Sequence, residues 1–153
     1  MQLSKPSFLI ALIVLLMSVL VWGAFFPLSH PRIFLNHRRA TQSITELNQA
    51  ERKYVVRHPD GGYACKLSVL GEQGLVDGVL ASGTKSGYHF EIRCLHDGGE
   101  KAKSFTITAV PVSPGLTGQY ALCADQSGEV WYSDKGLVPD CLAMHKPLER
   151  KYM

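Results

Sequence analysis

The sequence predicts an α+β protein in which a long N-terminal helix, first transmembrane and then amphipathic, packs on a roughly four-stranded antiparallel sheet. Three observations lead to this prediction. An uncharged apolar segment occupies residues 8–26, apolar residues then recur at steps of three and four as far as Tyr54, and from Tyr88 onward they alternate with polar residues. These patterns are typical of a membrane helix, an amphipathic helix and half-buried strands, respectively.

The apolar segment 8–26 holds 19 residues, of which Ser18 is the only clearly polar one. A helix of this length spans about 28 Å, close to the thickness of the hydrocarbon core of a bilayer. We therefore predict a transmembrane helix over residues 8–27, preceded by a short basic tail at 1–7. The alternative is a signal peptide cleaved before Ala24. The bulky Trp22 and Phe25 beside that site favour retention of the helix.

Pro27 and Pro31 follow the apolar segment and predict a kink or short break where the helix leaves the membrane. The amphipathic helix is expected over residues 28–58 and ends before Pro59, because the proline and two glycines that follow do not continue a helix. Its opposite face is rich in Arg and Lys, which favours a solvated surface beside anionic lipid head groups. Its apolar stripe consists of Ala40, Ile44, Leu47, Ala50 and Tyr54.

Residues 59–142 are expected to form one globular α+β domain, followed by a C-terminal tail at 143–153. The Gly-rich connection at 63–87 has room for one or two short helices. Short turns between alternating segments predict an antiparallel meander. From Asp134 onward the sequence lacks periodicity, which predicts a loop that returns to the edge of the sheet. The four expected strands lie near residues 88–94, 105–109, 120–124 and 130–132.

The cysteines and the basic residues favour opposite sides of the membrane. An even number of cysteines in a small domain favours disulfides over free thiols and an exported location, with three connectivities open. Three arginines at positions 32–39 would instead keep this side in the cytoplasm by the positive-inside rule. We give the cysteines more weight. The four cysteines, all after the apolar segment, are Cys65, Cys94, Cys123 and Cys141.

No pattern in the sequence is typical of catalysis. The net charge of +3, without a basic run interleaved with aromatics, does not indicate nucleic acid as a partner. Residues 78–86 approach a phosphate-binding loop, but Thr84 is an extra residue before Lys85 and misplaces its ammonium group. Cys94 and His96 approach zinc-ligand spacing without a second such pair. We therefore predict a non-enzyme with no cofactor, no metal and no small-molecule substrate.

Four stretches of the sequence, GYAC at 62–65, SGTKSGY at 82–88, VPVSPG at 110–115 and ADQSGEV at 124–130, carry a family resemblance. With the order of the expected elements, they resemble type IV pilins and the pseudopilins of type II secretion over residues 40–142. The resemblance implies a single-pass protein of the bacterial inner membrane with its C-terminal domain in the periplasm. Its partners would be membrane lipid and other pilin-like subunits or envelope assembly proteins.

The resemblance also implies a disulfide pairing. Pilin-like proteins commonly close their C-terminal loop with a bridge, which here favours Cys123–Cys141 and leaves Cys65 to pair with Cys94. A bridge that closes a loop of this size contributes about 3 kcal/mol in the chain-entropy model.

The N-terminus departs from the family pattern. When Pro27 is matched to the helix proline of the family, Lys5 stands in place of the Gly at the peptidase site, and Ile10 stands in place of the helix Glu. Two functions follow as expectations. One is a divergent minor pilin or pseudopilin, and the other is a membrane-tethered exported binding module that no longer enters filaments.

Overall fold

The structure is a computed structural model that describes residues 10–19, 29–95 and 101–148. The chain divides into two units, Met1–His30 and Pro31–Met153. In the first unit, residues 10–19 are helical and exposed. No helix within the described ranges combines the length and the apolar character needed to cross a membrane. The predicted span 8–27 extends beyond the described residues at both ends and stays a prediction.

The long helix of the fold is α2 (Ser29–Arg57), close to the predicted amphipathic helix at 28–58. Pro31 lies in the first turn of α2, where the backbone N–H groups have no intrahelical partner, so the helix continues through it. The expected break therefore does not occur at Pro31, and Pro27 lies outside the described residues. Four residues of the predicted apolar stripe, Ala40, Ile44, Leu47 and Ala50, are at most 1% exposed, and the fifth, Tyr54, is partly buried against the core.

The sheet has five antiparallel strands in the order β1-β2-β3-β4-β5, one more than predicted. The additional strand β1 pairs with β2 through Thr84 and His89. It holds two residues, too few to produce an alternating pattern in a sequence. The strands are β1 (Thr84–Lys85), β2 (Tyr88–Leu95), β3 (Ser104–Pro111), β4 (Ala121–Asp125) and β5 (Val130–Ser133).

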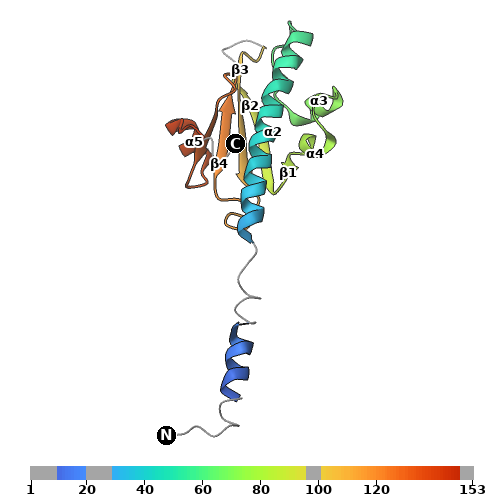
Figure 1. Cartoon of the computed structure of the whole chain (residues 1–153). Helices are drawn as coiled ribbons and strands as arrows, with labels where there is room; N and C mark the ends of the chain where they lie inside the picture. The colour runs from blue at the N-terminus through green and yellow to red at the C-terminus, as the bar shows by residue number, and fades with distance from the viewer. Residues whose placement is uncertain (1–9, 20–28, 96–100, 149–153) are drawn as a thin grey trace. The chain divides into compact units, whose positions relative to one another are not determined.

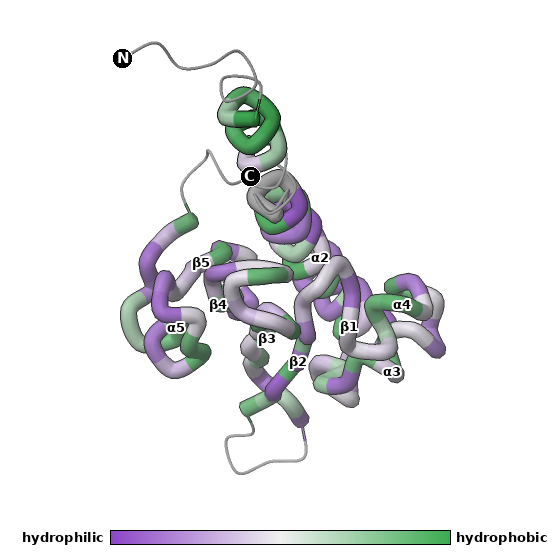
Figure 2. Tube along the Cα trace, turned by 90° about the horizontal axis from the view of Figure 1, so that it is seen from below, coloured by the Kyte–Doolittle hydropathy of each residue, from purple (hydrophilic) through white to green (hydrophobic). Residues whose placement is uncertain are grey.

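The core lies between α2 and the face of the sheet that this helix covers (Figures 1 and 2). Successive side chains of a strand point to opposite faces, so the strands β2, β3, β4 and β5 send alternate residues into this layer. Burial of each large apolar side chain contributes about 1.5–3 kcal/mol. The largest of these side chains from the strands are Tyr88, Phe90, Phe105, Ile107 and Leu122, all at most 1% exposed.

Among the described residues, the short helices α3, α4 and α5 flank the sheet (Figure 2). The connection after α2 contains α3 (Leu67–Glu72) and α4 (Gly78–Ala81), near the β1 edge, in agreement with the one or two helices expected there. At the other side, α5 (Val138–Met144) packs against β4 and β5.

The prediction of a loop after Asp134 was wrong for residues 138–144, which form α5. The predicted domain boundary at 142 falls inside this helix. A helix of seven residues with a proline at its start is too short to show a period, and tertiary contacts must stabilise it. The tail beyond α5 does return to the sheet edge as expected. The N–H of Tyr132 donates to the Lys146 carbonyl at 3.0 Å, and the N–H of Leu148 donates to the Val130 carbonyl at 3.1 Å.

Candidate interaction surface

The side of α2 that faces away from the sheet is polar and largely exposed, as its sequence pattern predicted. Part of this side forms a shallow groove of about 310 Å³. The groove is lined by one carboxylate and otherwise by hydroxyl and amide groups, so it offers hydrogen bonds but no acid–base pair. Its lining residues are Thr41, Gln42, Thr45, Glu46 and Gln49.

Lys85 of β1 lies beside this groove and links three elements. Its ammonium lies 3.6 Å from Oε2 of Glu46 and donates a hydrogen bond to Asp77. This hydrogen bond raises the pKa of Lys85 and lowers the pKa of Asp77. Asp77 also caps α4, because its Oδ1 accepts from the N–H of Leu80 at 2.8 Å. Exposed pairs of this kind contribute about 1 kcal/mol or less, so the cluster mainly orients α4 and β1.

The four cysteines form two disulfides, Cys65–Cys94 and Cys123–Cys141, which is the pairing that the family resemblance implied. Both sulfurs of the second bridge are buried beside Trp131, and this bridge fastens α5 to β4. The first bridge is half-buried and joins the loop after α2 to the end of β2.

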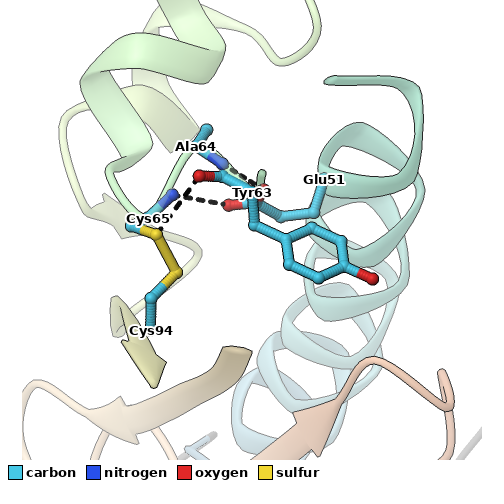
Figure 3. The surroundings of a disulfide bond; sticks show 5 residues. All are labelled: Glu51, Tyr63, Ala64, Cys65 and Cys94. Atoms are coloured by element: carbon cyan, nitrogen blue, oxygen red, sulfur yellow. Dashed lines mark hydrogen bonds between the residues drawn. A yellow bond between two sulfur atoms is a disulfide. The ribbon is translucent and has the colours of Figure 1, made fainter. Parts of the chain in front are cut away.

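Glu51 of α2 anchors the loop that carries the first disulfide (Figure 3). Its side chain is 0% exposed, and its carboxylate accepts hydrogen bonds from the N–H of Ala64 at 2.8 Å and of Cys65 at 3.1 Å. Burial raises the pKa of Glu51, and the two hydrogen bonds partly oppose that shift. A buried carboxylate that carries charge is stabilised only where donors of this kind meet it.

Sequence reasoning missed Glu51, although a signal was present. Glu51 follows Leu47 by four residues and Ile44 by seven, so it lies on the same buried side of the helix. A carboxylate on the buried side of a helix needs hydrogen-bond donors. This position therefore predicts that another segment of the chain supplies them.

The loop held by Glu51 has an unusual backbone. Gly62 has φ of 77° and Cys65 has φ of 61°, both in the left-handed region. A Cβ at Gly62 would lie 2.5 Å from the carbonyl oxygen of Ala102, so only glycine fits there. Cys65 is the strained member because it carries a side chain. The hydrogen bond from its N–H to Glu51 and its disulfide hold it in place from two sides.

The connection between β3 and β4 is held against the first turns of α2. The Nδ2 of Asn36 donates to the carbonyl of Thr117 at 3.0 Å. The Nδ1 of His37 lies 3.4 Å from the Tyr88 hydroxyl. The rings of His37 and Tyr120 pack edge to face, with their centroids 5.3 Å apart. Burial lowers the pKa of His37, which favours its neutral imidazole. These contacts place the β3–β4 connection at the end of the globular unit where α2 begins.

Among the described residues, no group of three or more His, Cys, Asp or Glu side chains is placed to hold a metal ion. Cys94, which the sequence offered as a zinc ligand with His96, is bonded to Cys65. His96 lies outside the described residues. The segment that resembles a phosphate-binding loop folds into α4 and β1, with Lys85 engaged by acidic side chains.

Comparison of the chain with protein-family models, with curated proteins and with solved structures gave no match. By its fold, the globular unit is a small α+β domain in which one long helix packs across an antiparallel sheet. Two disulfides crosslink this domain.

Proposed function

We propose that the chain is a membrane-anchored pilin-like subunit, a minor pilin or pseudopilin, of a type IV pilus or type II secretion-like envelope assembly. The observation that carries the proposal is α2, which packs one side on an antiparallel sheet and leaves the other side exposed. In sequence, α2 directly follows the apolar segment 8–26. In this proposal the segment anchors the protein in the bacterial inner membrane, and the globular unit lies in the periplasm.

The positions of the four family-like stretches support the proposal. GYAC is the loop held by Glu51, and SGTKSGY spans the β1–β2 turn. VPVSPG begins with the last two residues of β3 and continues into the connection after it, and ADQSGEV spans the β4–β5 turn. Each stretch contains glycine in the left-handed region, so the resemblance concerns residues that determine the turns of the fold. These glycines are Gly62, Gly83, Gly87, Gly115 and Gly128, with φ between 75° and 86°.

The chemistry of the surface also favours a structural role. The groove on α2 has hydrogen-bonding groups but no paired acid and base. On the sheet face that α2 does not cover, His89, Glu91 and Arg93 of β2 are exposed, and the guanidinium of Arg93 donates to Glu91 at 2.9 Å. Polar surfaces of this kind suit contacts between subunits that are also stable on their own.

Site-specific photo-crosslinking in native membranes tests the proposal. A photoreactive amino acid replaces Gln42 or Thr45 on the exposed side of α2, and a control replaces the exposed Glu129 in the β4–β5 turn. We expect adducts from α2 that contain a second pilin-like subunit or another assembly component, with few from the control. Recovery of monomer alone from both α2 positions would contradict the proposal.

The second candidate function is a membrane-tethered binding module that no longer enters filaments. Lys5 and Ile10, in place of the family's Gly and Glu, favour it, and the groove on α2 would be its binding surface. Genes for an assembly ATPase or a secretin next to this gene would support the first function. Adducts at Gln42 that persist in cells lacking every pilus and secretion component would support the second.

A further inference from the structure

We propose that the end of the globular unit where α2 begins docks on the surface of an anionic lipid bilayer. We call this end the basal surface; its members are Arg32, Phe34, Leu35, Arg39, Val112 and Leu116. The inference rests on the membrane attachment in the proposed function and adds a second, peripheral contact with lipid. Figure 2 views the unit from this end and shows hydrophobic and hydrophilic residues side by side along α2.

The first observation is a group of exposed apolar side chains from two segments distant in sequence. Phe34 and Leu35 of α2 are 44% and 47% exposed, and Val112 and Leu116 of the β3–β4 connection are 55% and 69% exposed. The hydrogen bond from Asn36 to the Thr117 carbonyl brings the two segments together at one end of the unit. Exposed apolar side chains that gather in this way mark a surface for a partner or a membrane.

The second observation is the charge of this end. The first 45 residues of the chain contain no Asp or Glu, whereas Arg32, Arg38 and Arg39 lie on the exposed side of α2. Residues 112–120 carry no charge at all. Asp134 and Asp140, which follow β5 at the same end of the sheet, lie 3.3 Å and 3.4 Å from lysine ammonium groups. The basal surface therefore combines apolar and basic side chains without a free acidic counterpart among these residues.

This composition fits lipid better than a second copy of the chain. Basic residues attract anionic head groups while apolar side chains enter the boundary between head groups and acyl chains. The aliphatic stems of arginines lie along apolar surface while their charged ends stay in the polar layer. In a symmetric contact between two copies, the arginines of both copies would gather in one interface, where like charges repel and these residues supply no free carboxylate. Phe34 also follows the apolar segment 8–26 by only eight residues, so the bilayer is the nearest partner along the chain.

The test uses the full chain with both disulfides intact, in vesicles of phosphatidylcholine alone or mixed with phosphatidylglycerol. Flotation first reports membrane attachment. A photoreactive amino acid then replaces Leu116, and a matched control replaces Val56, which is 79% exposed in the last turn of α2. Both positions are exposed, so the fold tolerates the photoreactive residue. Disulfide mapping checks that each variant has formed both native bridges.

We expect lipid adducts at position 116 in anionic vesicles and few at position 56. In the Leu116 probe, replacing Arg32 and Arg39 by glutamine lowers the adduct by up to about fivefold for each arginine. A chain that floats but gives equal adducts at both positions, or only protein dimers at position 116, overturns this inference and leaves membrane attachment intact. A chain that does not float overturns both.

Discussion

Replacement of Glu51 by alanine should loosen the loop that carries the Cys65–Cys94 bridge. The substitution removes the acceptor of two backbone hydrogen bonds, at 2.8 Å to Ala64 and 3.1 Å to Cys65. Hydrogen bonds to a charged group contribute about 1.5–3 kcal/mol each, so their combined loss is about 3–6 kcal/mol. Removal of the buried charge offsets part of this. We expect the free energy of unfolding to fall by about 2–4 kcal/mol.

Denaturant unfolding of the detergent-solubilised full chain, with its disulfides oxidised and followed by circular dichroism, measures this loss. The control is Glu46→Ala on the same helix, where the carboxylate is 41% exposed and lies 3.6 Å from Lys85. That variant should lose about 1 kcal/mol or less. Equal losses in the two variants would refute the argument that the buried carboxylate holds the loop.

The pH dependence of Glu51→Gln supplies an independent check. Because burial raises the pKa of Glu51 in the folded protein, the folded state holds this proton more tightly than the unfolded state does. The contribution of Glu51 to stability is therefore greatest below its ordinary pKa. It decreases as the pH rises through its raised pKa, and above that pH the two backbone hydrogen bonds to the ionised carboxylate supply what remains. The stability of the parent chain minus that of Glu51→Gln should fall over this window. A constant difference would contradict the pKa shift.

Two further outcomes are expected. Under mild reductant the half-buried Cys65–Cys94 bond should open before the buried bridge between β4 and α5, as followed by alkylation and mass spectrometry, and the reverse order would contradict the burial argument. Ile44→Ala should lower the free energy of unfolding by about 2–5 kcal/mol because its side chain is 0% exposed in the core. In the same denaturant titration Val56→Ala, at a position 79% exposed, should change it by about 0.5 kcal/mol or less.

The periodicity of apolar residues in the sequence was enough to predict the long helix and the four longer strands. The steps of three and four that place Ala40, Ile44 and Leu47 on one side of a helix do not depend on the rest of the chain. The predicted helix at 28–58 and the observed α2 at Ser29–Arg57 therefore nearly coincide. The four longer strands were also found from their alternation, which follows from the two-residue repeat of a strand.

Contacts between distant residues decided the rest. The strand β1 is defined by the pairing of Thr84 with His89, and α5 packs against β4 and β5 and is bonded to β4 through Cys141. The sequence left three disulfide connectivities open; the fold brings the Cα atoms of the two observed pairs to 5.4 Å and 6.1 Å. A disulfide forms only between cysteines whose Cα atoms lie this close, and the spacing of cysteines along the sequence does not give that distance.

For the surfaces too, some properties follow from the local sequence and others only from contacts between distant residues. The sequence alone determined that one side of α2 is polar and that no acidic residue precedes Glu46. Only the tertiary structure set Leu116 near the start of α2 and turned the carboxylate of Glu51 toward Ala64 and Cys65. Composition and period are properties of neighbouring residues, whereas burial and contact depend on which distant segments meet when the chain folds.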